Sequence, residues 1–501
     1  MPIYSKGANW IPADYFVERL QKEDYKRLLR DAIRANMNTL RIWGGGIYEP
    51  DHFYELCDEM GIMVWQDFMF ACSLYPANKK FINSVEKEAS YQIQRLKSYA
   101  CIILWCGNNE VADAWFNWGW KEKLPDNLWS DYKTLFHSIL PRICKDYDPK
   151  RLYWPSSPGH KIEPPKEGQL YGSGDNHYWG VWHGGDDFEA FNKNVGRLMS
   201  EYGMQSYPEL STIKSFYKSK SMSIKSKVMT AHQKASLGNK NVLMYIDRYY
   251  LKPNSFESLL TLSQIMQAEA IKTAVEAHRR NMPYCMGTLY WQLNDCWPGA
   301  SWSSIDYNKN WKVLHYLAKH FFEAIFVTAY KSKKDIEVFV INDTQEEKRC
   351  NLLIELHDFE GGNRILFNNN TDTTTTSAAL TFNGTQLNVT NNIRANNLTF
   401  GLTSGTTINT ATGDLILDSS NNKVHITANA EVDGTLTVDS STNSSSKDTG
   451  ALILTAGGLG VEGNIHAGGA IHAAGDIFAF SSSDIELKED ISPIENALDM
   501  I

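Results

Sequence analysis

The segment Leu104-Trp105-Cys106-Gly107-Asn108-Asn109-Glu110 (residues 104–110) begins in an apolar run and ends in two amides and a carboxylate. The run from Ile102 to Trp105 predicts a buried strand, and Gly107 predicts the end of that strand. Because burying an unpaired carboxylate is costly, a carboxylate directly after a core strand indicates a functional role for Glu110. Glu201, in Leu198-Met199-Ser200-Glu201-Tyr202-Gly203, follows a second apolar run in the same way.

On both sides of this segment the chain alternates predicted strands with predicted helices. Seven predicted strands cover residues 1–9, 39–43, 62–66, 101–105, 152–154, 197–200 and 285–291, and a sixth strand in chain order lies within 171–179. The predicted helices include 51–60, 81–97, 128–144 and, after the last strand, 311–322. Such alternation predicts a parallel sheet covered by helices. Eight strands over about 320 residues fit an α/β fold of the (β/α)₈ TIM-barrel class.

In a TIM barrel the chemistry lies at the carboxyl ends of the strands. The unusual residues of this chain lie at or just after the ends of its predicted strands: Arg41, Trp43, Asp67, Asn109, Glu110, His177–Trp179, Glu201 and Trp291. Glycosidic cleavage needs one carboxyl group to protonate the leaving oxygen and another to meet the positive charge that develops at the anomeric carbon. Burial among aromatic residues such as Trp105 and Trp118 would raise the pKa of the proton donor. Glu110 and Glu201 are therefore a candidate glycosidase pair.

Each of these residues also has a structural interpretation. In that interpretation Glu110 is a structural carboxylate in a salt bridge, and Glu201 is a helix cap or a surface residue. Trp43 and Trp291 are then aromatic residues of the buried core. Residues 44–46 are three glycines that no Lys-Ser/Thr pair follows, so they do not form a phosphate-binding loop. Three glycines instead predict a backbone that passes close to a ligand or turns sharply. Two histidines, at 177 and 183, lack partners at metal-ligand spacing, so no metal site is predicted.

Composition excludes several classes of protein. The formal net charge of -9 argues against a general nucleic-acid binder. No apolar run reaches the roughly 18 residues of a membrane helix. Residues 1–9 contain no apolar signal-peptide core, which leaves the compartment unknown. The eight cysteines are irregularly spaced and form neither a disulfide framework nor a metal pattern.

Residues 1–330 resemble the catalytic barrel of the β-mannosidases in glycoside hydrolase family 2. The matching stretches are Lys6-Gly7-Ala8-Asn9-Trp10-Ile11-Pro12, Arg41-Ile42-Trp43-Gly44-Gly45-Gly46, Trp65-Gln66-Asp67-Phe68, Gly107-Asn108-Asn109-Glu110, Ser200-Glu201-Tyr202-Gly203 and residues 289–298, Leu-Tyr-Trp-Gln-Leu-Asn-Asp-Cys-Trp-Pro. The resemblance implies a retaining glycosidase that acts on β-mannoside oligosaccharides or glycoprotein glycans without a metal or organic cofactor.

The same resemblance implies roles for individual residues. Glu110 would be the acid/base and Glu201 the nucleophile, and Asn109 would bind the sugar 2-hydroxyl. Three tryptophans (Trp43, Trp118 and Trp291) would line the mannose subsite, and Tyr178 and Arg41 would support the nucleophile.

The chain also departs from this family. The family carries a sugar-binding-like sandwich and an immunoglobulin-like domain before the barrel, whereas this sequence starts at the first barrel strand. A loop of that leading sandwich helps to close the mannose pocket, so weak or absent activity is an expectation even with both carboxylates present. Residues 335–341 resemble the opening strands of the sandwich that follows the barrel, which predicts a partial immunoglobulin-like β-sandwich over 331–366.

Beyond residue 366 the composition changes. All 15 Trp, all 24 Tyr and all eight Cys precede residue 351, and the remainder is rich in Thr, Asn, Ser, Gly and Ala. Short alternating runs at 379–382, 386–389, 397–400, 414–417 and 435–438 indicate a β-rich, fibre-like tail over 367–480, either a β-solenoid or a homotrimer that covers its narrow strands. A disordered linker is the alternative.

The end of the sequence carries a second resemblance. Residues 450–461 and the Gly/Ala/His repeats after them resemble the shafts of phage and giant-virus tail fibres, which implies association with a virion. Residues 481–501 resemble the start of the self-cleaving intramolecular chaperone domain of those fibres, with Ser483, Asp484 and Lys488 at its cleavage site. The body of that domain does not follow, and a Lys that activates a Ser needs a surrounding fold, so no proteolysis is predicted.

Three hypotheses follow from the sequence. The first is a β-mannosidase barrel joined to a fibre-like tail, which the presence of both glutamates favours. The second is a structural or receptor-binding virion protein whose barrel binds glycans without turnover. The third is a joining of unrelated reading frames, which the incomplete sandwich at 331–366 favours.

Overall fold

The computed structural model describes residues 2–159, 172–219, 221–331, 335–344, 346–349 and 352, the backbone of 380–382 and 387–389, and Glu462. Most of the predicted fibre-like tail, the predicted sandwich beyond residue 352 and the three residues Ser483, Asp484 and Lys488 lie outside the described residues. Contacts divide the chain into one unit of residues Met1–Asn397 and a second of Leu398–Ile501, in which only Glu462 is described.

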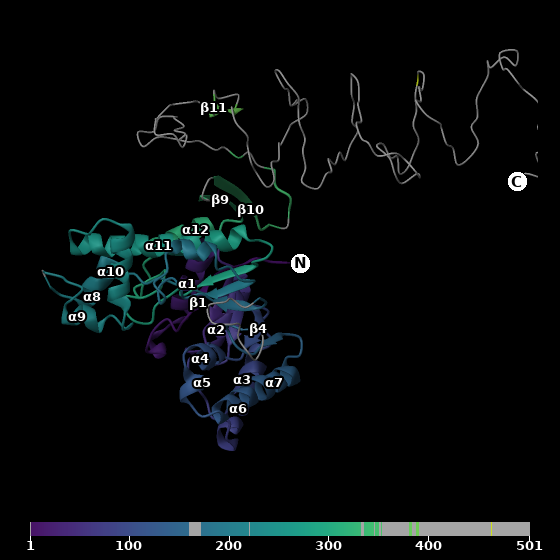
Figure 1. Cartoon of the computed structure of the whole chain (residues 1–501). Coiled ribbons are helices and arrows are strands. Elements are labelled where there is room, and N and C mark those ends of the chain that lie inside the picture. Colours follow the sequence, from purple (N-terminus) through teal and green to yellow (C-terminus); the bar gives the residue numbers. More distant parts are fainter. Residues whose placement is uncertain are drawn as a thin grey trace, which may run out of the picture. The chain divides into compact units, whose positions relative to one another are not determined.

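The first unit contains a TIM barrel of eight parallel strands in the order β5-β4-β3-β2-β1-β8-β7-β6 (Figure 1). The strands are β1 (Ser5–Trp10), β2 (Thr39–Ile42), β3 (Met63–Asp67), β4 (Ile102–Cys106), β5 (Leu152–Trp154), β6 (Asp175–His177), β7 (Leu198–Glu201) and β8 (Gly287–Tyr290). The predicted fold class of residues 1–330 is therefore confirmed.

Helices follow most of the strands and cover the sheet. They are α1 (Lys22–Arg34), α2 (Asp51–Met60), α3 (Lys79–Leu96), α4 (Val111–Asn117), α5 (Trp120–Lys123), α6 (Asn127–Thr134), α7 (Leu140–Tyr147), α8 (Leu210–Phe216), α9 (Lys227–Ala231), α10 (Gly238–Tyr249), α11 (Phe256–Arg280) and α12 (Val313–Phe321), with 3₁₀ turns at Val17–Arg19 and Phe188–Asn192. A π-helical turn at Leu135–Ile139 joins α6 to α7. None of the described helices combines the length and the apolar composition needed to span a bilayer.

Local signals in the sequence explain several helix ends. Gly61 ends α2 in the left-handed conformation with φ 72°, which glycine adopts without steric cost. The Asn78 side chain accepts a hydrogen bond from the backbone N–H of Phe81 and so caps the start of α3. The N-cap residue of α2 is Pro50, and Asp51 is the first residue of the helix.

Side chains link the two edge strands of the barrel sheet. Within the described residues no backbone ladder joins β5 to β6. Trp154 at the end of β5 donates from Nε1 to Asp175 Oδ1 of β6 at 2.8 Å, and Ser157 Oγ donates to Asp175 Oδ2 at 2.6 Å. These bonds fix the start of β6, a strand whose last residue belongs to the site described below.

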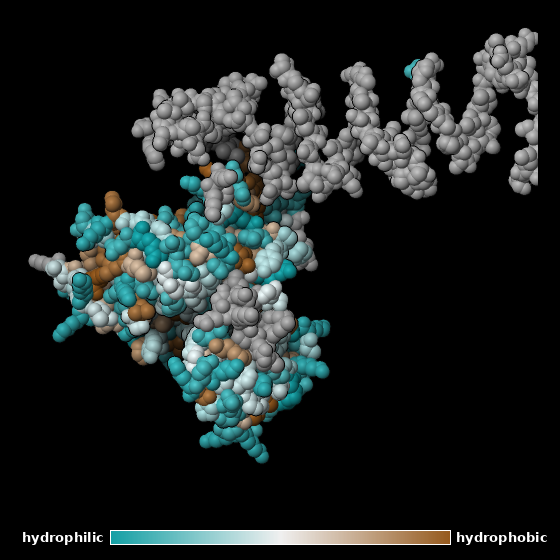
Figure 2. Space-filling model, viewed as in Figure 1, coloured by the Kyte–Doolittle hydropathy of each residue, from teal (hydrophilic) through white to brown (hydrophobic). Residues whose placement is uncertain are grey.

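A hairpin of β9 (Ile325–Lys331) and β10 (Ile336–Asn342) follows the barrel. Its outer face exposes apolar side chains, including Val327, Val338 and Val340, and Figure 2 shows hydrophobic surface around this hairpin. After the hairpin, Asp343 forms ion pairs with Lys6 at 3.0 Å and with Arg279 at 3.1 Å. Farther on, β11 (Leu380–Phe382) and β12 (Leu387–Val389) form an antiparallel pair.

Candidate active site

Two glutamates meet at the carboxyl end of the barrel strands. Glu201 is the last residue of β7 and is 3% exposed, and Glu110 follows β4 and is 9% exposed. One carboxylate oxygen from each glutamate and a ring nitrogen of His177 all lie within 4.8 Å of one another. The structure therefore brings together the two carboxylates that the sequence singled out.

Glu110 has an unusual backbone conformation. It precedes α4 with φ 60° and ψ 9°, in the left-handed region that is uncommon for residues other than glycine. Its N–H donates to the carbonyl oxygen of Ser157 at 2.7 Å, which helps to hold this conformation. Such local strain, of roughly 1–3 kcal/mol, is concentrated at functional sites.

A cleft of about 580 Å³ contains both carboxylates, and this size is typical of small-molecule sites. Aromatic rings form much of its wall, and Trp43 and Trp291 pack edge to face with ring centroids 5.0 Å apart. The residues that line it are Trp43, Cys72, Asn109, Glu110, Asp113, Trp118, His177, Trp179, His183, Glu201, Trp291 and Trp302.

The glycine triplet packs against the protein itself. A Cβ on Gly45 would lie 1.9 Å from the indole of Trp43, and one on Gly44 would lie 2.6 Å from the carbonyl oxygen of Phe70. The triplet therefore lets the backbone pass beneath the Trp43 ring at the edge of the cleft.

Arg41 is a fully buried cation beneath the cleft. Its guanidinium donates to Glu201 Oε1 at 2.6 Å, to Asp67 Oδ2 at 2.9 Å, to Asn109 Oδ1 at 2.7 Å and to Asn9 Oδ1 at 3.0 Å. A buried charge is tolerated when it is paired and hydrogen-bonded in this way. Arg41 thus fixes the orientation of Glu201 and Asn109 together.

His177 was predicted among the strand-end residues, but it was assigned no role beyond its exclusion as a metal ligand. Its Nδ1 lies 2.7 Å from Glu110 Oε1 and 3.5 Å from Glu201 Oε2. Its Nε2 lies 2.9 Å from Ser157 Oγ. The available signal was its place at the end of a predicted strand, among the other polar residues that follow strands.

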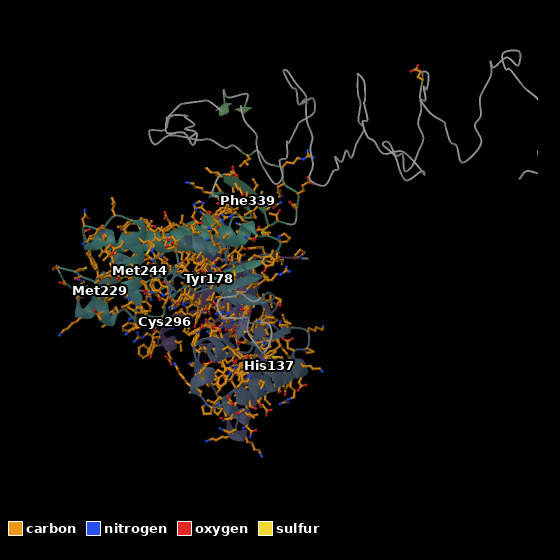
Figure 3. The ribbon with its side chains drawn as sticks, viewed as in Figure 1. His137, Tyr178, Met229, Met244, Cys296 and Phe339 are labelled. Atoms are coloured by element: carbon orange, nitrogen blue, oxygen red, sulfur yellow. The ribbon has the colours of Figure 1, made fainter. Side chains whose placement is uncertain are left out.

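The structure places the Tyr178 side chain away from Glu201. Its hydroxyl donates to Asp186 Oδ2 at 2.8 Å and accepts from Asn194 Nδ2 at 3.0 Å, and the residue is labelled in Figure 3. Only its backbone N–H reaches Glu201, by donating to that residue's carbonyl oxygen at 2.9 Å. The expected side-chain support of the nucleophile is thus not seen, and Trp179 lines the cleft instead.

Burial sets the protonation behaviour of the pair. It raises the pKa of Glu110, and it raises the pKa of Glu201 to about 7. Burial lowers the pKa of His177, because desolvation disfavours the charged imidazolium. His177 and Arg41 oppose the effect of burial on the pKa of Glu201, and Arg41 also opposes it for Glu110. Only Glu201 accepts a hydrogen bond from the Arg41 guanidinium, at 2.6 Å.

Glu110, His177 and Glu201 are also close enough together to act as metal ligands. The guanidinium of Arg41 already places a positive charge 2.6 Å from Glu201 Oε1 and would repel a metal cation there. The arrangement suits two carboxyl groups that act on one substrate better than metal binding.

Comparison with known proteins gives a consistent assignment. The chain is 39% identical over 379 residues to the β-mannosidase of Capra hircus, a match that covers 71% of this chain and 43% of that protein. It is 32% identical over 388 residues to β-mannosidase B of Aspergillus terreus, covering 72% and 46%. The crystal structure of the β-D-mannosidase from Dictyoglomus thermophilum superposes with a TM-score of 0.65 at 44% identity, covering 69% of this chain and 42% of that one.

No family model matches the chain. The chain spans less than half the length of these relatives. Over about 70% of its own length, the chain is homologous to the β-mannosidases.

Proposed function

We propose that the barrel is a retaining glycosidase that hydrolyses terminal β-D-mannosides. The observation that carries this proposal is the pair of carboxylates with oxygens within 4.8 Å of each other in an aromatic cleft. Retaining enzymes hold their carboxyl groups about 5–5.5 Å apart, whereas inverting enzymes need about 6.5–9.5 Å to admit a water. The substrate class rests on the β-mannosidases that the chain resembles.

The reaction is a double displacement. The Glu201 carboxylate attacks the anomeric carbon and forms a glycosyl ester, while Glu110 transfers its proton to the leaving oxygen. The Glu110 carboxylate then takes a proton from a water that attacks the anomeric carbon, which breaks the ester and releases mannose. Arg41, 2.6 Å from Glu201 Oε1, favours the ionised nucleophile and a good leaving carboxylate in the second step.

Hydrogen-bond directions support a proton on Glu110. Ser157 Oγ donates its single proton to Asp175 Oδ2 at 2.6 Å, so it accepts from His177 Nε2. Nδ1 of the neutral imidazole is then an acceptor, and the 2.7 Å contact with Glu110 Oε1 requires the proton to come from the Glu110 carboxyl group. His177 acts as a positioning residue that presents a protonated Glu110 to the cleft.

The remaining cleft residues suit a pyranose. Trp43, Trp118 and Trp291 offer rings for the apolar face of the sugar. The oxygen of the Asn109 amide is held by Arg41, and its NH₂ group donates to the weak acceptor Cys72 Sγ at 3.4 Å and also faces the Glu110 carboxyl group in the cleft. That NH₂ group is therefore available to the sugar 2-hydroxyl.

The test uses an aryl β-mannoside and three isosteric variants of the full chain. Glu201→Gln is expected to abolish turnover, and Glu110→Gln to slow it most for poor leaving groups. Glu122→Gln removes an exposed carboxylate on α5 and is expected to change nothing. Unchanged turnover in Glu201→Gln, or release of the α-anomer of mannose as the first product by NMR, would contradict the proposal. Binding of the mannoside by the unsubstituted chain without turnover would support the glycan-binding alternative.

For the tail we propose a fibre-like segment over 367–480 that assembles as a homotrimer. Its support is the alternating, turn-rich sequence, in which narrow strands bury little apolar surface within one chain.

A further inference from the structure

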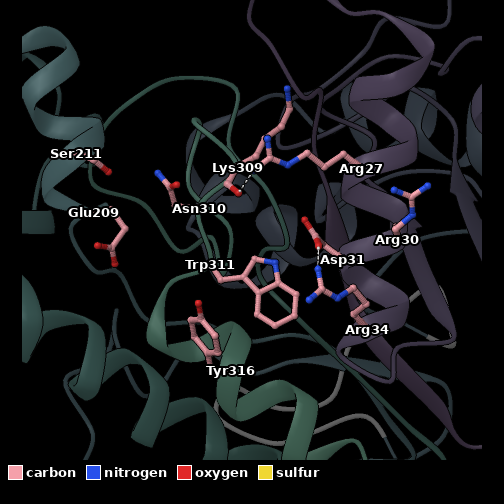
Figure 4. Close-up of a pocket in the computed structure, with 10 residues that line it drawn as sticks. All are labelled: Arg27, Arg30, Asp31, Arg34, Glu209, Ser211, Lys309, Asn310, Trp311 and Tyr316. Carbon is pink, nitrogen blue, oxygen red and sulfur yellow. Dashed lines mark hydrogen bonds and ion pairs between the residues drawn. The ribbon is translucent and has the colours of Figure 1, made fainter.

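A second cleft opens beside α1, on the side that faces the segment 309–311 and the start of α8 (Figure 4). Its volume is about 740 Å³, and it shares no lining residue with the cleft that holds the two glutamates. The β-mannoside mechanism makes no use of it.

Three arginines from one helix line this cleft. Arg27, Arg30 and Arg34 follow one another at intervals of three and four residues, which places them on one face of α1. Arg27 donates to the carbonyl oxygen of Lys309 at 2.9 Å, and Arg34 lies 3.4 Å from Asp31 Oδ1. The Arg30 guanidinium makes no hydrogen bond or ion pair with any residue in the described part of the chain. Several guanidinium N–H donors therefore remain available to a ligand.

The charge of the lining is opposite to that of the whole chain. Four cationic side chains (Arg27, Arg30, Arg34 and Lys309) face two carboxylates, Asp31 and Glu209, while Lys309 also pairs with Asp24 nearby. This local excess of positive charge stands on a chain with a formal net charge of -9. Guanidinium groups bind phosphate, sulfate and carboxylate groups through paired N–H donors.

Aromatic and neutral polar side chains lie between the arginines and Glu209. Trp311 lies beneath the Arg34 guanidinium at 5.0 Å, and Tyr316 packs against Trp311 while remaining 57% exposed. The side chains of Asn310 and Ser211 add neutral hydrogen-bonding groups. Figure 4 shows the aromatic pair in the cleft, with the arginines on one side and Glu209 and Ser211 on the other.

We propose that this cleft binds a small organic oxyanion: a molecule of sugar size that carries a phosphate, sulfate or carboxylate group. The guanidinium groups of α1 hold the anionic group, and Tyr316 and the edge of Trp311 contact the organic body. The cleft volume of about 740 Å³ accommodates both parts.

Calorimetric titration of the full chain tests this with three probes: glucose 6-phosphate, inorganic phosphate and glucose. We expect saturable, salt-sensitive binding of glucose 6-phosphate, weaker binding of inorganic phosphate and none of glucose. Arg30→Gln should weaken glucose 6-phosphate binding at least about tenfold, as expected for loss of a charge-assisted hydrogen bond. Tyr316→Ala should weaken glucose 6-phosphate but not inorganic phosphate.

Two controls make the result specific. Lys26→Gln removes the same charge from the same helix at a position that does not line the cleft, and it should leave the affinity unchanged. Glu201→Gln should also leave it unchanged, because the two clefts are separate. Four outcomes would each overturn the proposal. The first two are that glucose 6-phosphate does not bind even at millimolar concentration, or that it binds no more tightly than inorganic phosphate. The other two are that Lys26→Gln lowers the affinity for glucose 6-phosphate as much as Arg30→Gln does, or that Glu201→Gln abolishes binding.

Discussion

At the residue scale, the proposed mechanism gives two chemically identical side chains different roles through their neighbours. Glu201 lies 2.6 Å from a guanidinium, which favours its ionised form. Glu110 lies 2.7 Å from an imidazole whose other nitrogen is committed to Ser157, which favours its protonated form. Environments that separate the protonation of two nearby carboxyl groups assign the acid and the nucleophile.

The first prediction concerns pH. The active form has Glu201 ionised and Glu110 protonated, so kcat/KM should fall as pH drops through the lower apparent pKa and fall again as pH rises through the upper one. Burial raises the pKa of both carboxyl groups, that of Glu201 to about 7. The pH optimum of kcat/KM should therefore lie above the pKa range of exposed glutamates. Steady-state rates on an aryl β-mannoside between pH 4 and 10 measure this. In Glu110→Gln, with a leaving group that needs no protonation, the alkaline limb should disappear; a persistent limb would contradict the assignment.

The second prediction concerns His177. His177→Asn removes the acceptor that orients the Glu110 carboxyl group, so kcat should fall about 10- to 100-fold and the alkaline limb should shift. A purely structural role would lower the yield of folded protein without moving the limb. The pH profile of the variant therefore separates the two roles.

The third prediction concerns Tyr178, for which family resemblance and structure disagree. The resemblance implies contact with the nucleophile, whereas the structure places the hydroxyl on Asp186 at 2.8 Å. We therefore expect Tyr178→Phe to change kcat/KM less than tenfold. A loss comparable to that of His177→Asn would show that the side chain turns to Glu201 when substrate binds.

At the element scale, local patterns predict elements well where turn chemistry is explicit. Residues 51–60 and 152–154 were predicted as a helix and a strand with the bounds that α2 and β5 have. β6, Asp175–His177, lies within residues 171–179, where a strand was predicted, but an aromatic run did not fix its bounds, because such a run does not distinguish a strand from a packed loop. The contact of Arg41 with Glu201 joins residues 160 positions apart, and no local periodicity encodes it.

The fourth prediction tests how the hairpin after the barrel is held. Asp343 pairs with two buried cations, Lys6 and Arg279, and its removal leaves both without that partner. Asp343→Ala should therefore lower the free energy of unfolding by about 3–5 kcal/mol. Glu337→Ala, on the exposed side of β10, is the matched control and should have little effect. Equal denaturation midpoints for the two variants would show that the ion pairs do not stabilise the fold.

At the scale of the whole molecule, the chain combines a barrel homologous to β-mannosidases with a compositionally different C-terminal segment. Strand–helix alternation and strand-end residues predicted the barrel because both are repeated in every βα unit. The tail contains only short alternating runs. Its sequence does not indicate which of these strands pair, or whether they pair within one chain or between chains, so its fold could not be predicted in the same way.

The last prediction is the assembly state. If the tail trimerises, light scattering on the full chain should give three times the chain mass of 56.8 kDa at all concentrations above the dissociation constant. The exposed apolar face of β9 and β10 is a competing route to association, because such patches promote contacts between molecules. Val338→Lys and Val340→Lys place charges on that face, so a mass that stays threefold in this double variant assigns assembly to the tail. A monomeric mass for the unsubstituted chain would contradict trimerisation, and loss of the trimer in the double variant would assign assembly to the hairpin instead.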